Sequence, residues 1–361
     1  MKLLIWTNMP NHYQSAFFNA LRSDGIDLVV HYYSAVPENR IRLGWIEPVE
    51  LPTGEHYVPA KVASMKLCVD YDERIHILPG CGRPFLLALA LYCSQRGLKW
   101  LHWSEPSGPT SKWTIVKNLV RRSYASLNNR YGCGALANGD MARQDFLKWG
   151  IRPDRIRLLP YSMAPVSNVS GLKRPSAITG VRFLFLGVLT ARKGIDVLLA
   201  AFARVVLQYP DSRLTLVGYD SSGGKYQRAA ESLGIATQTR FLGSVAPGAV
   251  GDILAAHHVL VLPSRFDGWG MVLGEAASIG LALIASDMCG AAHHLIENGT
   301  AGYQVPAGDV QALAETMTRF CFAPETIALH GARSRELCAN FTPEKNSARL
   351  EAAIRDLCHA P

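Results

Sequence analysis

The sequence has 361 residues, of which 48% are hydrophobic and 18% charged, and its net charge is +8 at neutral pH. Its length suggests two domains with their own cores, and its composition excludes a disordered or fibrous protein. The longest uninterrupted apolar run, residues 85–93, is too short for a membrane-spanning helix, which needs about 20 residues. The positive net charge fits a partner that carries phosphates, or an anionic membrane surface.

The amino-terminal segment and the cysteines indicate where the protein resides. The first ten residues lack an apolar run long enough for a signal peptide, so we expect a cytoplasmic protein. Eight cysteines are scattered along the chain without a C-x-x-C pair. This spacing favours neither a zinc site nor a compact disulfide framework, and we expect free thiols that are mostly buried.

Residues 1–165 alternate short apolar runs with longer amphipathic stretches. We expect a strand at 2–7, a helix at 13–23 and a strand at 28–33. Such alternation is typical of βαβ units, in which helices cover a parallel sheet. A stretch rich in Ser, Pro and Gly, without periodicity, indicates a linker at 166–180.

A second series of the same kind covers residues 181–341. Its predicted strands are short and nearly all apolar, as expected for strands buried on both faces. They lie at 181–186, 214–217, 259–262 and 282–285, and a helix is expected at 194–209.

The last segment, 342–361, is predicted to contain a helix at 342–359 with Pro343 in its first turn, which packs back on the first domain. The expected fold class is therefore α/β, with two facing Rossmann-like doubly wound domains. Ligands of such domains bind at the carboxyl ends of the strands, so we expect the functional site in the cleft between them.

A first motif follows the strand predicted at 181–186. The strand ends at Gly187, a short loop carries Arg192 and Lys193, and Gly194 opens a helix. Two cations beside a helix amino terminus can bind a diphosphate. The alternative is a solvated basic turn, which is a common feature of protein surfaces.

A second motif follows the strand predicted at 259–262. Asp267 lies in the loop, Gly268 and Gly270 flank the start of a helix, and Glu275 lies inside that helix. The loop carboxylate can accept hydrogen bonds from sugar hydroxyls and the helical one from a ribose, while the glycines let backbone N–H groups approach a ligand. The alternative is a helix cap at Asp267 with Glu275 on a wet face.

Together these motifs resemble those of the GT4-type retaining glycosyltransferases, which have the GT-B fold. The resemblance covers most of the chain and is densest from Phe183 to Met317. It also includes Leu214 to Gly218, Arg240 to Gly243, Val259 to Ser264, Gly280 to Ala285, Glu297 to Gly302, Val305 to Asp309 and, in the first half, Leu136 to Gly139, Trp149 to Ile151 and Ile156 to Tyr161.

The resemblance implies a role for each residue of the two motifs. Arg192 and Lys193 bind the diphosphate of a nucleotide sugar, Glu275 binds its ribose, and Asp267 acts on the donor sugar. Gly187 and Gly218 let the nucleotide approach the strand ends, and the turn at Leu242 and Gly243 faces its base. The donor sugar is held by the backbone of Gly268, Trp269, Gly270, Met271 and Val272.

Two positions depart from the family's pattern. Asp267 stands where the family normally has Glu, which is one methylene longer, and Val188 stands where the family often has Arg. The resemblance further implies a metal-independent reaction without a cofactor, in which Arg192 and Lys193 stabilise the leaving diphosphate of a UDP- or GDP-sugar.

The acceptor side is marked by polar residues after two strands of the first half. His12 and Tyr13 follow the first strand, and His102 and Glu105 follow a later one. His102 or Glu105 could position or deprotonate an acceptor hydroxyl. The alternative for each is packing or an ordinary buried hydrogen bond.

Residues 106–139 contain no acidic residue. Such a stretch fits anionic lipid headgroups and hence a peripheral position on the inner face of a cell membrane. The alternative is a solvated helix face, and nucleic acid is disfavoured because no recognised binding motif accompanies the charge. The basic residues are Lys112, Lys117, Arg121, Arg122 and Arg130.

These observations predict a retaining glycosyltransferase with a glycan or lipid-linked acceptor, in bacterial cell-surface polysaccharide or glycolipid synthesis. Two alternatives stay open, namely a nucleotide-sugar epimerase of the same fold and a catalytically inactive nucleotide-sugar-binding protein. The departures at Asp267 and Val188 motivate the second alternative. An NAD-dependent dehydrogenase is disfavoured because no G-x-G-x-x-G follows the first strand.

Overall fold

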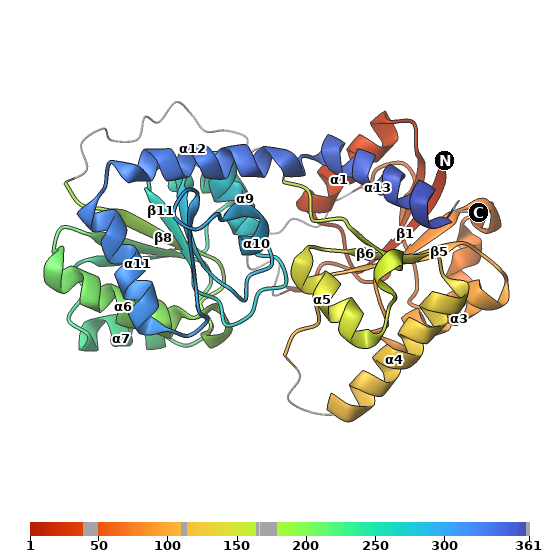
Figure 1. Ribbon diagram of the computed structural model, residues 1–361, viewed down its shortest axis with the longest axis horizontal. Helices are drawn as coiled ribbons and strands as arrows, with labels where there is room; N and C mark the ends of the chain where they lie inside the picture. Colours follow the sequence, from red (N-terminus) through yellow and green to blue (C-terminus); the bar gives the residue numbers. More distant parts are fainter. Residues whose placement is uncertain (39–49, 110–113, 164–165, 167–178, 359–361) are drawn as a thin grey trace. The chain divides into compact units, whose positions relative to one another are not determined.

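The computed structural model describes residues 1–38, 50–109, 114–163, 166 and 179–358. Its contacts divide the chain into two compact units, each built on its own parallel sheet (Figure 1). Of the described residues, unit 1 comprises those up to Ser162 and those from Pro343 onward, and unit 2 comprises those from Met163 to Thr342. The chain therefore leaves unit 1, forms unit 2 and returns to unit 1.

Unit 1 contains a seven-stranded sheet in the order β3-β2-β1-β4-β5-β6-β7, in which all neighbouring strands are parallel. The order reverses between β1 and β4, as in a doubly wound sheet. The strands are β1 (Lys2–Thr7), β2 (Asp27–Tyr32), β3 (Glu55–Tyr57), β4 (Ile75–Leu78), β5 (Trp100–Ser104), β6 (Gly134–Ala137) and β7 (Ile156–Leu158), and the helices are α1 (His12–Ser23), α3 (Pro84–Gln95), α4 (Thr114–Tyr131), α5 (Asp140–Trp149) and α13 (Pro343–Cys358).

The strands of unit 1 are buried on both faces. In β1, Leu3 belongs to the hydrophobic cluster that includes Phe18 of α1, whereas Leu4 belongs to the cluster that includes Leu89 of α3. Successive side chains of a strand point to opposite faces, so helices cover both sides of the sheet. This arrangement explains why the strands are apolar at nearly every position.

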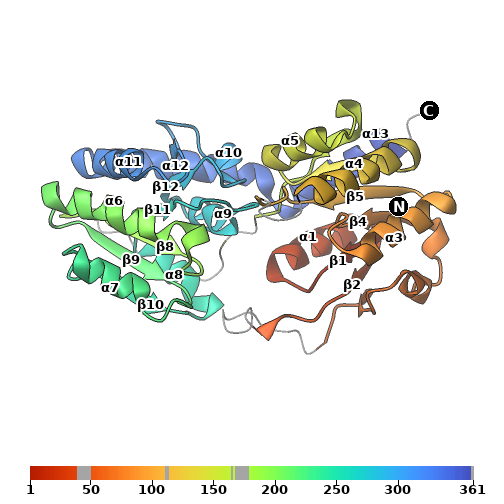
Figure 2. The same cartoon turned by 90° about the horizontal axis from the view of Figure 1, so that it is seen from below.

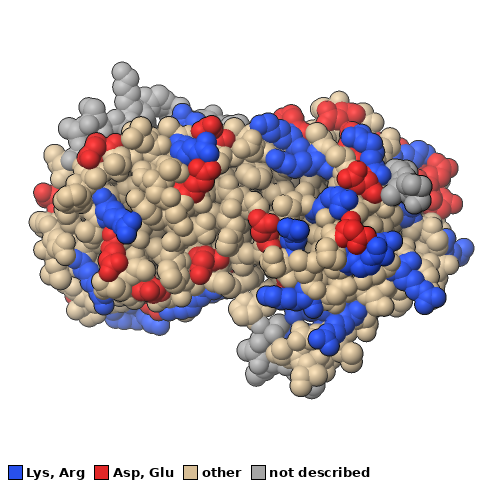
Figure 3. All heavy atoms as spheres, in the orientation of Figure 1, with Lys and Arg blue, Asp and Glu red and all other residues tan. Residues whose placement is uncertain are grey.

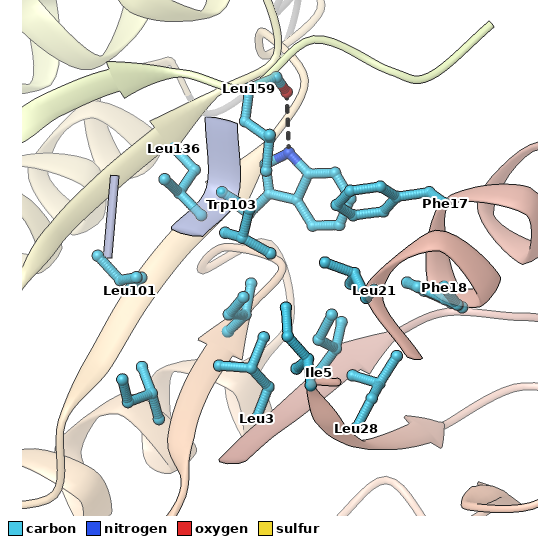
Figure 4. Close-up of a cluster of buried hydrophobic side chains, with 14 of the residues drawn as sticks. Leu3, Ile5, Phe17, Phe18, Leu21, Leu28, Leu101, Trp103, Leu136 and Leu159 are labelled. Carbon is cyan, nitrogen blue, oxygen red and sulfur yellow. Dashed lines mark hydrogen bonds between the residues drawn. The ribbon is translucent and has the colours of Figure 1, made fainter. Parts of the chain in front are cut away.

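Figure 4 shows the cluster on the α1 side of the sheet. Trp103 lies against Phe17 with 5.8 Å between the ring centroids, and its indole N–H donates to the carbonyl oxygen of Leu159 at 3.3 Å. Helix α13 packs against α1 and adds its fully buried Ile354 to the same cluster. The last helix of the chain is therefore part of the core of unit 1.

Unit 2 contains a six-stranded parallel sheet in the order β10-β9-β8-β11-β12-β13 (Figure 2). Helices α6, α7 and α11 pack together on one side, and α9, α10 and α12 pack together on the other. The strands are β8 (Arg182–Leu186), β9 (Arg213–Val217), β10 (Thr239–Gly243), β11 (Val259–Leu262), β12 (Ala282–Ser286) and β13 (Gly302–Val305), and the helices are α6 (Ile195–Gln208), α7 (Lys225–Ser232), α8 (Val250–Ala255), α9 (Met271–Ser278), α10 (Ala292–Leu295), α11 (Val310–Phe322) and α12 (Thr326–Cys338).

The strands and helices predicted from the sequence are confirmed to within one residue at each end. Most of the predicted linker, 166–180, lies outside the described residues. Within the described part of the chain, no helix combines the length and the apolar character that crossing a membrane requires. The eight cysteines are free thiols, four of them buried and four half-buried.

Three histidines are buried in the sheet of unit 1, namely His31, His76 and His102. Burial lowers the pKa of His31 and of His76 to about 4 and the pKa of His102 to about 3, because the imidazolium form is removed from water. Below the ordinary pKa of 6.5, the unfolded chain takes up protons that the folded unit does not. The free energy of unfolding therefore falls as the pH falls from about 6.5 to about 4.

We predict that His76→Phe reduces this dependence of stability on pH. Removing one titrating group removes about 1.4 kcal/mol of pH-linked free energy for each unit by which its pKa is shifted. Urea unfolding at a series of pH values, followed by tryptophan fluorescence, measures the effect. Six of the seven tryptophans precede residue 150, so this signal reports mainly on unit 1.

The control is His293→Asn, which changes an exposed histidine of unit 2 and should leave the pH dependence as it is in the wild type. Identical slopes in the wild type and in His76→Phe between pH 6.5 and 4 would contradict the assignment.

Candidate functional site

The strand order of unit 2 reverses at β8, which lies between β9 and β11. The chain passes from β8 to α6 and from β11 to α9, and these helices lie on opposite sides of the sheet. An open α/β sheet has a crevice at such a switch point, outside the carboxyl ends of its strands, and ligands bind there. The two loops that begin at this place carry Arg192, Lys193 and Asp267.

Glycines bring the ends of β8, β9 and β10 close together. The N–H of Gly187 donates to the carbonyl of Val217, and the N–H of Gly218 donates to the carbonyl of Gly243, both at 2.8 Å. At Gly218 φ is +139°, and a Cβ atom there would overlap the carbonyl oxygen of Gly187, so only glycine fits. Leu242 lies half-buried where the register of β10 shifts. These predicted donor positions therefore lie side by side at the carboxyl ends of β8, β9 and β10.

Lys193 and Asp267 form an ion pair at the switch point. Lys193 ends the short 3-10 turn Ala191–Lys193, and its ammonium group donates to Oδ2 of Asp267. Their side chains are only 13% and 14% exposed, so water screens their attraction less than it does at the surface. The structure thus joins two residues to which the sequence analysis gave separate roles, one toward the diphosphate and one toward the sugar.

Arg192 joins the loop after β8 to the loop after β11. Its Nη1 donates to the carbonyl of Phe266 at 2.8 Å, and its own carbonyl accepts from the N–H of Arg265 at 2.8 Å. The side chain is exposed. A guanidinium group carries five N–H donors, so this contact leaves donors for a bound anion.

Arg265 is a residue of this site that the sequence analysis missed. Its guanidinium donates at 2.7 Å to both carboxylate oxygens of Asp196, the second residue of α6, and at 2.6 Å to the carbonyl of Ala191. The hydrogen bonds from Arg265 lower the pKa of Asp196. Paired charge-assisted bonds of this kind also fix orientation, so Arg265 holds the loop after β11 against the turn that carries Lys193.

The segment from Gly268 to Val272 ends the loop and begins α9. Gly270 has a φ of +89° and precedes the first turn of α9, which is capped by no side chain of the described residues. A Cβ atom at Gly270 would lie 3.7 Å from Oδ2 of Asp267, so the carboxylate lies near the start of the helix. The backbone N–H groups of this turn, including those of Met271 and Val272, are donors beside the ion pair.

Trp269 and Glu275 differ in how much of their side chains is exposed. Trp269 is buried, with its ring centroid 5.5 Å from that of His294, so its side chain belongs to the core and its backbone alone faces the loop. The carbonyl of Trp269 accepts from the N–H of Ala291 at 2.8 Å, which fixes the loop. Glu275 is half-buried in the second turn of α9.

His102 lies in the core of unit 1, and this placement argues against its predicted role at an acceptor hydroxyl. It is fully buried in β5, its Nδ1 lies 3.2 Å from the hydroxyl of Tyr124, and its Nε2 lies 2.9 Å from that of Ser104. The rings of Phe146 and Trp149 pack edge-on against it. With a pKa of about 3, its side chain is a neutral, packed imidazole.

Glu105 is exposed directly after β5 and stays a candidate acceptor base. The hydroxyl of Tyr161 donates to its carboxylate, and burial together with this carboxylate raises the pKa of Tyr161. Tyr13 lies half-buried in the first turn of α1, while the side chain of His12 is outside the described part of the chain.

A D-x-D sequence, with which many other sugar transferases hold a divalent ion, occurs at Asp70 to Asp72. The Asp70 carboxylate accepts from Arg74 at 2.7 Å and pairs with Lys2 at 2.9 Å, and these two cations lower the pKa of Asp70. Among the described residues, no group of three or more His, Cys, Asp or Glu side chains is arranged to hold a metal ion. Metal independence stays a prediction.

Comparisons with known proteins find similar sequences and structures among glycosyltransferases. Residues 174–329 match the family model described as glycosyl transferases group 1. The chain is 30% identical over 209 residues to a D-inositol 3-phosphate glycosyltransferase of Streptomyces griseus, covering 53% of this chain and 44% of that protein. It is also 30% identical over 247 residues to a phosphatidyl-myo-inositol mannosyltransferase of Mycobacterium leprae, covering 60% and 62%. The chain thus spans about half the length of these curated relatives.

Among solved structures, Anabaena HepE in complex with UDP matches with a TM-score of 0.77 at 16% sequence identity. The match covers 99% of this chain and 100% of that one. This likeness confirms the predicted fold class, two Rossmann-like doubly wound sheets of the GT-B type. Residues 174–329 therefore match the glycosyl transferases group 1 model, in agreement with the family resemblance inferred from the sequence.

Proposed function

We propose that the protein transfers a sugar from a nucleotide-diphosphate sugar to an acceptor hydroxyl, with retention of the anomeric configuration and without a metal ion. The observation that carries the proposal is the meeting of Lys193, Asp267 and Arg192 at the switch point of unit 2. The family match of residues 174–329 and the UDP bound by HepE support a nucleotide-diphosphate donor, for which we propose a UDP- or GDP-sugar.

Lys193 and Arg192 are the groups that bind the diphosphate in this proposal. During transfer, the bond between the anomeric carbon and the diphosphate oxygen breaks, and its electron pair stays on the diphosphate. The acceptor oxygen bonds to the anomeric carbon and loses its proton. We assign to Lys193 and Arg192 the role of stabilising the negative charge that develops on the leaving diphosphate.

Lys193 exchanges partners when the donor binds. In the structure its ammonium group is held by Asp267. A diphosphate carries more negative charge than one carboxylate and attracts the ammonium group more strongly. Asp267 then becomes an acceptor for hydroxyls of the donor sugar, so binding of the diphosphate prepares the carboxylate for the sugar.

We predict that Lys193→Ala weakens the binding of UDP or GDP by about 2 kcal/mol, or about 30-fold, because a charge-assisted contact is lost. Isothermal titration calorimetry measures the change. Lys225→Ala, which removes an exposed lysine of α7, serves as the control and should bind as the wild type does. An unchanged affinity in Lys193→Ala would remove this residue from the diphosphate site.

We predict that Asp267→Asn lowers turnover at least tenfold while nucleotide affinity is kept or improved. The asparagine side chain lacks the negatively charged oxygens that accept hydrogen bonds from the donor sugar. It also no longer competes with phosphate for Lys193. Calorimetry with UDP and GDP, together with mass spectrometry of transfer products, separates the two effects. Glu231→Gln, at an exposed position of α7, is the matched control.

Equal losses of affinity and turnover in Asp267→Asn would contradict the role given to this carboxylate. The same incubations distinguish the other functions. An isomerised free sugar formed by the wild type without any acceptor would indicate an epimerase. A nucleotide sugar that binds and is never transferred to any acceptor would indicate an inactive binding protein.

For the acceptor we propose a glycan or lipid-linked glycan of the cell surface, with Glu105 as the base. One relative is named for a lipid, phosphatidyl-myo-inositol. Helix α4 offers the matching surface, because Ile115, Val116 and Leu119 in its first two turns are 86%, 50% and 64% exposed. Lys117 is exposed among them.

The first two turns of α4 combine apolar and basic groups. Ile115 and Leu119 are four residues apart and share one face of the helix. Arg122 is exposed one turn further on, and Arg121 lies over the ring of Trp149 at 5.5 Å. Figure 3 shows basic groups and no acidic group over the protruding end of α4. Apolar side chains with cations at their margin suit an anionic lipid surface, which we propose as the partner.

We predict that the protein binds vesicles containing anionic phosphatidylglycerol and that Ile115→Asp with Leu119→Asp weakens this binding at least tenfold. The double change removes apolar contacts and adds negative charge to the surface. Vesicle co-sedimentation measures the bound fraction. Leu207→Asp is the control, since Leu207 is 85% exposed in unit 2. Equal binding of the double variant and the control would exclude α4 as the lipid-binding element.

A further inference from the structure

Two thiols that are far apart in the sequence meet in unit 1. Cys133 lies between α4 and β6, and Cys358 is the last residue of α13. Leu357, which precedes Cys358, lies against Gly134, which follows Cys133, and the two thiols interact with each other. Both are half-buried at the margin of the cluster shown in Figure 4, so they are in contact with each other and partly exposed to solvent.

Consecutive residues of α13 hold its end against the sheet. Asp356 pairs with Nε of Arg157 in β7 at 3.3 Å. Leu357 places its Cδ1 3.3 Å from the position that a Cβ atom of Gly134, the first residue of β6, would occupy. Cys358 then contacts the residue that precedes β6. These contacts of three consecutive residues fix the last turn of α13. The two thiols lie close together because the whole turn packs against the sheet.

The other side of the contact is held by hydrogen bonds of the backbone. The N–H of Cys133 donates to the carbonyl of Trp100 at 2.8 Å, and Arg155 donates to the carbonyl of Gly132 at 2.8 Å. The side chain of Asn128 donates to the carbonyl of Gly134 at 3.0 Å. The cysteine is thereby held in place on both sides along the chain.

The two thiols differ in acidity. The hydrogen bond from Cys358 lowers the pKa of the Cys133 thiol, and the positive charges of Lys99 and Arg155 act in the same direction. The same hydrogen bond raises the pKa of Cys358, which keeps its proton. Thiolates attack disulfides and thiols do not, so Cys133 is the group that reacts first.

We propose that Cys133 and Cys358 form a reversible disulfide that fastens the end of α13 to the sheet of unit 1, with a small-molecule disulfide such as oxidised glutathione as the oxidant. The Cys133 thiolate attacks one sulfur of the oxidant, forms a mixed disulfide and releases one glutathione thiolate. Cys358 then loses its proton, attacks the Cys133 sulfur and releases the second glutathione thiolate. Two protein thiols are oxidised, one disulfide is reduced to two thiols, and the two protons pass to the released thiolates.

The bond would act on the segment with which the chain returns to unit 1. It links residues on either side of unit 2 in the sequence, so it closes a long loop and restricts the unfolded chain. The inference is independent of the proposed sugar transfer, because it concerns neither the switch point of unit 2 nor Glu105.

The test uses the full chain, equilibrated in buffers of increasing oxidised-to-reduced glutathione ratio, quenched with an alkylating reagent and digested. Peptide mass spectrometry should find the linked Cys133–Cys358 peptide. We expect the midpoint of thermal unfolding to rise by about 5 °C in the oxidised wild type, and dithiothreitol to reverse the rise.

Cys133→Ala and Cys358→Ala should each abolish both the linked peptide and the rise. Cys321→Ala, which removes a half-buried thiol of unit 2, should retain both. The proposal is overturned if no linked peptide forms at the most oxidising ratio, if glutathione stays attached to Cys133 in the wild type, or if the thermal shift persists in Cys358→Ala. Because oxidised and reduced wild type are compared directly, a variant that fails to fold does not affect the result.

Discussion

The ion pair between Lys193 and Asp267 is the interaction on which the site of unit 2 depends. The two residues are 74 positions apart in the sequence and meet because the sheet order places β8 beside β11. Both side chains are largely removed from water. A buried charge without a partner of opposite sign lowers the stability of the fold. Each of the two loops therefore depends on the other to keep its charged side chain at the strand ends. The pair is therefore both a structural contact and the working part of the proposed donor site.

Hydrogen bonds around this pair connect the backbone of the surrounding loops and strand ends. Hydrogen bonds join the ends of β8, β9 and β10, and Arg265 joins the loop after β11 to Asp196 of α6. In the proposed reaction, an incoming diphosphate would displace the Asp267 carboxylate from the Lys193 ammonium group by rotation of side chains. A site whose backbone is already ordered before the ligand binds loses little conformational entropy on binding.

Local sequence predicted most of the fold, because strands buried on two faces are apolar throughout. It also singled out the two loops that meet at the switch point, because the residues of each motif are adjacent in the chain. The pairing of Lys193 with Asp267, and the hold of Arg265 on Asp196, depend on strand order, which local sequence does not encode. The burial of His102 was not predicted, for a related reason. Binding residues usually follow the carboxyl end of a strand, whereas His102 lies within β5. Helices cover both faces of this sheet, so a side chain of β5 is buried on whichever face it lies.

The return of α13 to unit 1 has a consequence for synthesis on the ribosome. The apolar face of α1, with Phe17 and Phe18, is covered in part by residues that are translated after the whole of unit 2. The described helices and strands of unit 2, from β8 to α12, follow one another in the sequence and can complete their core as they emerge. Unit 1 is translated first but waits for residues 343–358. The half that begins the chain is thus the last to finish folding, and during that interval its uncovered helix is a surface that chaperones can bind.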